Sequence, residues 1–246
     1  MLYKIKWSMV SKRICCNQYQ FNTKWLKENV SNYNCDYIIY KRTPTIKKWN
    51  TIKKDSHNPN LVLLKNLGLR PNISHTYLTH IVNNYDNLYD IEIFLDAKYQ
   101  DNYTHSLWEQ ISNCHRYDFK GLGNLEKKLT WNDLDFMIEK KNKYKIYDVK
   151  YVHQPPNTKW KGWSLYQKLF PKYCENRTIK PSCDFPVTRM SAYSLFSVKK
   201  ELIRKYPKST YKMLLEEFNP NQKSKKEMIE NDYIMEHTWK LFFKSK

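Results

Sequence analysis

The sequence predicts an α/β fold: a single domain with a mostly parallel central sheet flanked by helices. Between residues 13 and 42, two apolar segments typical of strands enclose a short amphipathic helical pattern. Such a β-α-β order places the two strands parallel in one sheet. Residues 75–95 then show a helical pattern followed directly by a buried strand. No break in composition marks a boundary, so we expect residues 1–246 to form one domain, with a short N-terminal extension at residues 1–10.

The first half of the chain supplies the elements in a clear order. Residues 13–19 predict the first strand, residues 23–30 a short helix, and residues 36–42 the second strand. Residues 43–60 are polar and contain two prolines, which is typical of a loop. Residues 61–68 are a short apolar segment that leads toward the central helix.

The central helix and strand form the most distinctive stretch. Five apolar side chains share one face of a helix by their spacing: Tyr77, Leu78, Ile81, Val82 and Tyr85. Residues 91–95 are rich in β-branched and aromatic side chains, which favour a strand, and Asp96 follows directly. Ligands of open α/β sheets bind beyond the carboxyl ends of strands. Asp96 is therefore either a site residue or an ordinary turn residue.

The rest of the chain is less regular until its last third. Residues 104–114 predict a helix, residues 121–123 a flexible turn, residues 131–138 a further helix and residues 145–152 an edge strand. The C-terminal third predicts one strand and three helices, at residues 193–198, 199–205, 209–218 and 227–243.

Composition narrows the classes of function. The net charge of +19 favours anionic partners such as nucleic acid or phosphorylated sugars, although the excess of lysine with abundant asparagine, tyrosine and isoleucine is also typical of an AT-rich genome. With only 4 glycines, the chain has no P-loop and no dinucleotide-binding pattern. The 6 cysteines lack zinc-type spacing, and we expect reduced thiols in the cytoplasm. No long apolar run predicts a membrane span.

Three blocks of sequence resemble a known but uncharacterised family. The central block follows the signature N-x-G…TYL…YDNL-x-D…FL. The matching positions are residues 25–26 with 40–42, then 66–68, 75–78, 81, 84–88, 90 and 94–95, and finally 194–198 with 203, 207, 211 and 214. The chain thereby resembles glycosyltransferase-like proteins of fungi, bacteria and large DNA viruses, whose fold is expected to be GT-A-like. If the protein is viral, this implies the host cytoplasm or the virion as its location.

The resemblance implies a nucleotide-sugar donor bound across the first strands of the sheet. GT-A enzymes commonly use Asp-x-Asp at a strand end to hold a divalent metal on the donor diphosphate, and this sequence has Asp96-Ala97-Lys98 instead. Either Asp96 binds Mn²⁺ or Mg²⁺, with help from Asp101 or His237, or Lys98 neutralises the diphosphate without a metal. The alternative for His237 is packing within the aromatic last helix. The family also usually has Gln-Gly after its F-L, where this chain has Asp96-Ala97.

Further residues complete the predicted site. Five polar residues after the first two strands would contact the nucleotide and its phosphates: Asn17, Gln18, Tyr19, Lys41 and Arg42. For Lys41 and Arg42 the alternative is a solvated basic strand end. Asp184, before the turn at residues 185–186, is the candidate base that takes the proton of the acceptor hydroxyl, and its alternative is a solvated loop residue. The acceptor would be a glycan or a protein.

Two other classes of function stay open. Basic stretches such as residues 140–150 loosely fit a nucleic-acid-binding protein, but no DNA- or RNA-binding motif accompanies them. The missing second aspartate also allows a GT-A-like scaffold without activity.

Overall fold

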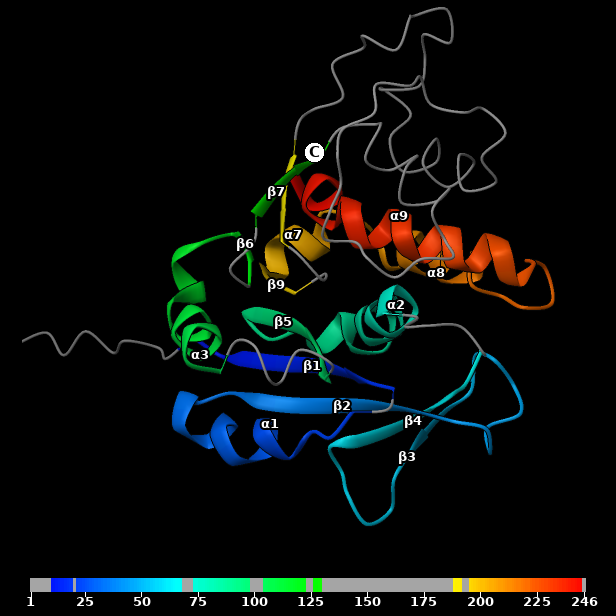
Figure 1. Cartoon of the computed structure of the whole chain (residues 1–246), viewed down its shortest axis with the longest axis horizontal. Coiled ribbons are helices and arrows are strands. Elements are labelled where there is room, and N and C mark those ends of the chain that lie inside the picture. The colour runs from blue at the N-terminus through cyan, green and yellow to red at the C-terminus, as the bar shows by residue number, and fades with distance from the viewer. Residues whose placement is uncertain are drawn as a thin grey trace, which may run out of the picture.

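A computed structural model describes residues 10–19, 21–67, 73–97, 104–122, 126–129, 188–191 and 195–244. These residues form a mixed seven-stranded sheet in the order β3-β4-β2-β1-β5-β9-β6, with helices on both faces (Figure 1). Its strands are β1 (Lys12–Gln18), β2 (Asp36–Thr43), β3 (Ile52–Lys54), β4 (Leu61–Lys65), β5 (Ile91–Asp96), β6 (Phe119–Gly121) and β9 (Phe196–Lys199). A separate antiparallel pair consists of β7 (Glu126–Leu129) and β8 (Thr188–Ser191).

The sheet is mixed, whereas the sequence predicts a mostly parallel one. Strands β4, β2, β1 and β5 are parallel neighbours in the centre. At the edges, β3 pairs antiparallel with β4, and β9 lies antiparallel between β5 and β6. The connection from β3 to β4 is only a few residues long, and such a connection permits antiparallel pairing alone. The parallel prediction therefore holds for the central strands and is wrong for the edges.

Helices pack against the sheet from both sides. The longer helices are α2 (Ile73–Asn84), α3 (Thr104–Asn113), α8 (Lys208–Glu216) and α9 (Lys225–Lys244), and the shorter ones are α1 (Lys24–Asn29) and α7 (Lys200–Arg204). Helices α2, α8 and α9 contribute to one hydrophobic core, and α1 and α3 to the other. Helix α9 also reaches the sheet directly, because its Trp239 and Phe243 pack on Phe196 of β9. Figure 1 shows α9 running beside α8. None of the helices within the described residues is long and apolar enough to cross a membrane.

Side-chain alternation along the central strands divides the two cores. In β1, Ile14 and Cys16 face the core of α1 and α3, while Cys15 faces the core of α2. The flanking residues Arg13 and Asn17 share the face of Cys15 and are also buried. This strand therefore places two buried polar side chains beneath α2, one at each end.

Most predicted elements appear within a few residues of their expected bounds. Three segments differ. Residues 52–54, predicted as loop, form the edge strand β3; residues 61–65 form the full strand β4; and the predicted turn at 121–123 overlaps the end of β6. In the case of β3, the strand gains its hydrogen bonds from β4 and needs no apolar pattern of its own. The predicted helix at 131–138 and strand at 145–152 lie outside the described residues.

Candidate functional site at the carboxyl edge of the sheet

The order of the central strands creates a switch point between β1 and β5. From β1 the chain moves outward to β2 and β4, and then returns to place β5 on the other side of β1. The connecting helix α1 lies on one face and α2 on the other. Ligands of open α/β sheets bind beyond the carboxyl ends of the strands at such a point. Here the two strand-end partners at that point are Asn17 and Asp96.

A buried chain of hydrogen bonds joins three strand ends to α2. Asn17 Nδ2 donates to Asp96 Oδ2 at 3.0 Å, and Thr76 Oγ1 donates to Asn17 Oδ1 at 2.7 Å. Arg42 Nη2, at the end of β2, donates to Thr76 Oγ1 at 2.8 Å. All four side chains are buried. Because each hydrogen bond fixes the orientation of the next group, the Asp96 carboxylate is held in a defined position.

Arg42 is bound from several directions. Its Nη1 donates to the backbone oxygen of Lys65, at the end of β4, at 3.1 Å, and its Nη2 lies 3.2 Å from His75 Nδ1. A guanidinium can only donate, so His75 Nδ1 accepts and the ring proton is on Nε2. Burial lowers the pKa of Arg42 to about 10, against the raising effect of Asp232 and Asp96. The side chain therefore stays cationic at neutral pH and joins β2, β4 and α2.

The first turn of α2 is capped by a carboxylate from a distant helix. Asp232 of α9 accepts a hydrogen bond from the Ser74 backbone N–H at 2.8 Å, and Ser74 Oγ donates to the Asp232 backbone oxygen at 3.2 Å. Ser74 lies inside the first turn of α2, which begins at Ile73. Burial raises the pKa of Asp232, and its hydrogen bonds to Ser74 oppose that rise. The helix N-terminus thus already holds an anionic group from within the protein.

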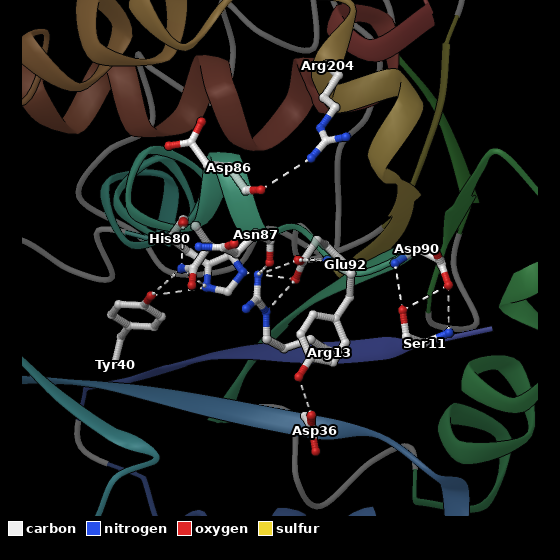
Figure 2. A network of polar contacts seen from close by, with 12 residues as sticks. Ser11, Arg13, Asp36, Tyr40, His80, Asp86, Asn87, Asp90, Glu92 and Arg204 are labelled. Atoms are coloured by element: carbon white, nitrogen blue, oxygen red, sulfur yellow. Dashed lines mark hydrogen bonds and ion pairs between the residues drawn. The ribbon is translucent and has the colours of Figure 1, made fainter. Parts of the chain in front are cut away.

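A second polar network lies under the other half of α2 (Figure 2). Glu92 accepts from Arg13 Nε at 3.1 Å and Nη2 at 2.5 Å, and His80 Nε2 lies 3.0 Å from Glu92 Oε2. Tyr40 OH lies 3.1 Å from His80 Nδ1. All four side chains are buried, so they are suited to fixing α2 on β1, β2 and β5. Burial lowers the pKa of His80, which favours a neutral ring.

The structure brings three predicted site residues together: Asn17, Arg42 and Asp96. Gln18 is the last residue of β1 and Tyr19 follows it directly. Gln18 Nε2 donates to the Phe21 backbone oxygen at 2.8 Å, and Tyr19 lies within electrostatic reach of Arg42. Lys41 alternates with residues that face α2, so it lies on the opposite face of β2, and it is exposed.

The other predicted residues cannot be placed in this way. Lys98, Asp101 and Asp184 lie outside the described residues. His237 belongs to α9, but its side chain is also outside the description. Within the described residues, no group of three His, Cys, Asp or Glu side chains could hold a metal ion. The described part of the site thus does not by itself fit a divalent metal, because Asp96 is its only member from the predicted metal set.

The sequence gives little signal for several residues of this region. Thr76, His75 and Asp232 were not predicted as site residues, although all three are buried around the carboxyl edge. Thr76 and His75 lie in the signature at residues 75–78 that carries the family resemblance, but neither matches a family position with a known role. Asp232 lies far along the chain in α9, and nothing local to it indicates a contact with α2.

The fold and the buried polar groups define an α/β protein with a candidate ligand site at the switch point of its sheet. The chain belongs to a family described as a protein of unknown function, DUF3431, whose match extends over residues 14–246. This confirms the predicted membership of an uncharacterised family. No curated protein and no solved structure matches the chain.

Proposed function

We propose that the protein is a glycosyltransferase that moves a sugar from a nucleotide-sugar donor to a glycan or protein acceptor. The observation that carries the proposal is the position of Asp96. This carboxylate ends a central parallel strand, next to Asn17 at the topological switch point, and is oriented by a buried hydrogen-bond chain. That is the place where α/β sheets bind nucleotides, and it agrees with the GT-A-like resemblance of the sequence.

The proposal gives each described residue a specific role. Asp96 faces the donor, and Asn17 orients Asp96. Gln18, the last residue of β1, and Tyr19, directly after it, contact the nucleotide. Arg42 is a positioning residue, because both of its terminal nitrogens donate within the protein and a direct bond to phosphate would require their exchange.

The remaining predicted roles stay predictions. Asp184 is the candidate base, Lys98 the candidate cation for the diphosphate, and Asp101 and His237 the candidate partners of Asp96 for Mn²⁺ or Mg²⁺. A bound metal would supply positive charge on the leaving diphosphate. Lys41 would reach a phosphate only from the other face of β2.

Calorimetric titration with UDP- and GDP-sugars, with and without Mn²⁺, tests the proposal. We expect the intact protein to bind at least one donor, and Asp96→Asn to weaken that binding about tenfold or more, because a charged hydrogen-bonding group is lost. Asn keeps an oxygen that can accept from Asn17, so the fold should persist. Asp118→Asn is the matched control, since Asp118 is exposed and lies beside Lys199, at the opposite edge of the sheet from Asp96.

Two outcomes would contradict the proposal. The first is the absence of binding and of hydrolysis for every nucleotide sugar. The second is salt-dependent binding to single-stranded nucleic acid while all donors are inert, which would favour the nucleic-acid-binding alternative. If a donor binds and Asp96→Asn binds it with the same affinity, donor binding stands as proposed but Asp96 is not part of the donor site.

A further inference from the structure

Tyr77 is a completely buried phenol whose hydroxyl has no hydrogen-bond partner within the part of the chain that the structure describes. Its ring packs against Phe94 and Phe196 on the sheet, with ring centroids 4.8 and 5.8 Å away, and against Trp239 of α9 at 6.3 Å. A buried hydroxyl without a partner is unfavourable, and most such groups in proteins are paired. Within the described residues, the hydroxyl of Tyr77 is therefore a buried donor that is available to an external acceptor.

Two carboxylates lie within electrostatic reach of this hydroxyl, and both come from the carboxyl edge of the sheet or the helix that covers it. Burial raises the pKa of Tyr77 well above its ordinary value, and Asp96 and Glu236 raise it further. The phenol consequently stays protonated and acts as a donor. The arrangement combines one buried donor with two acceptor groups.

The path of α9 explains why Glu236 lies here. Asp232, one turn earlier, bonds to Ser74 in the first turn of α2, and Trp239, three residues later, packs on Tyr77. Residues three and four apart share a side of a helix, so Glu236 lies between these two contacts and along the same side. It is half-buried, while Trp239 is buried and its Nε1–H also lacks a partner among the described residues.

We propose that Glu236 and the Tyr77 hydroxyl bind the hydroxyl groups of the donor sugar next to Asp96. This inference rests on the proposed glycosyltransferase function and extends it to the class of sugar. Carboxylates accept hydrogen bonds from sugar hydroxyls, and the phenol donates to a sugar oxygen. Two nearby carboxylates also repel a third, so the site takes neutral sugars and rejects sugar acids.

Glu236→Gln and Tyr77→Phe test the site by comparing UDP-glucose or UDP-galactose with UDP-glucuronic acid and with UDP alone. In the intact protein the neutral sugars bind more tightly than UDP-glucuronic acid. Both substitutions weaken binding of the preferred neutral donor about tenfold and leave UDP binding unchanged, because UDP has no sugar to contact. Glu236→Gln also narrows the preference for neutral sugars over the acid. Tyr77→Phe does not lower the unfolding stability, since the described residues give this hydroxyl no hydrogen-bond partner.

Glu201→Gln on α7 makes the same chemical change at an exposed glutamate and serves as the control for Glu236→Gln. The inference is overturned if neutral donors bind but Glu236→Gln leaves their affinity and the neutral-to-acid ratio unchanged. It is also overturned if both substitutions weaken UDP as much as the UDP-sugars, which would indicate a merely structural role. If no nucleotide sugar binds to any form of the protein, the inference falls together with the proposed function.

Discussion

At the scale of single residues, Arg42 lies at a basic strand end but is buried, and it links β2 to β4 and α2 through hydrogen bonds. It comes from a Lys-Arg pair whose two members alternate across β2, so Lys41 faces outward while Arg42 turns under α2. The planar guanidinium reaches Lys65, His75 and Thr76 at once. A lysine has a single terminal nitrogen and cannot donate to all three of these groups at once.

Arg42→Lys should therefore destabilise the protein while keeping its charge. We expect the free energy of unfolding to fall by about 2–3 kcal/mol, because several buried acceptors lose their donor. Denaturation in urea measures the change. Lys41→Ala, at the neighbouring exposed position, should stay within about 0.5 kcal/mol of the unchanged protein. An equal loss for the two variants would contradict the structural role of Arg42.

At the scale of elements, α2 is the helix on which the candidate site depends. It supplies Thr76 to the hydrogen-bond chain at the carboxyl edge, Tyr77 to the proposed sugar site, and His80 to the network at the opposite end. Its N-terminus is held by Asp232 of α9. The position of α2, and with it the site, therefore depends on a contact between two distant helices.

Substitution of Asp232 tests how much this contact between α9 and α2 contributes to stability. Asp232→Ala leaves buried N–H groups of the α2 N-terminus without an acceptor, so we expect a loss of about 1–3 kcal/mol in unfolding free energy. Asp232→Asn should lose less, because its amide oxygen can still accept from Ser74. Urea denaturation measures both, with the exposed Lys225→Ala on α9 as control. Equal losses for the alanine and asparagine variants would show that the negative charge, rather than the acceptor, matters.

At the scale of the whole molecule, two buried polar networks lie at the two ends of α2 and tie it to the sheet. Burial holds the pKa of His80 and of His75 below the ordinary value of 6.5. Burial would raise the pKa of Glu92, but His80 and Arg13 outweigh it, and the pKa lies below its ordinary value of 4.5. The native protein therefore binds fewer protons at these groups than the unfolded chain does.

Stability should consequently fall in mild acid. For a histidine with a lowered folded pKa, the stabilising contribution is present above pH 6.5 and is lost as the pH falls toward the folded pKa. Each such histidine adds a slope of up to about 1.4 kcal/mol per pH unit below its unfolded pKa. Below pH 4.5 the loss at Glu92 adds to this in the same direction.

Urea denaturation between pH 7.5 and 5.5 checks this expectation. His80→Gln should have a shallower pH slope than the unchanged protein, whereas His57→Gln, at an exposed position, should not. Asp232 acts in the opposite sense, because burial raises its pKa above the ordinary value of 3.8, but it is common to all variants and does not affect the comparison. Identical slopes for His80→Gln and the unchanged protein would show that His80 is not held neutral.

The sequence by itself determined the α/β class, the central β-α-β unit and the place of Asp96. Each of these follows from local information: apolar periodicity within one segment, or a polar residue directly after a buried strand. It also identified Asn17 and Arg42, because both lie at or next to the ends of clearly patterned strands.

Only the tertiary structure decided how these residues meet. The antiparallel edges of the sheet and the strand β3 depend on hydrogen bonds to a neighbour, which no single segment encodes. Asp232 and Glu236 reach the first half of the chain because α9 packs on α2, and this contact joins residues that are far apart in sequence. Local pattern thus fixes elements and strand ends, whereas a site built across the sheet is fixed by long-range packing, whose partners a single sequence does not name.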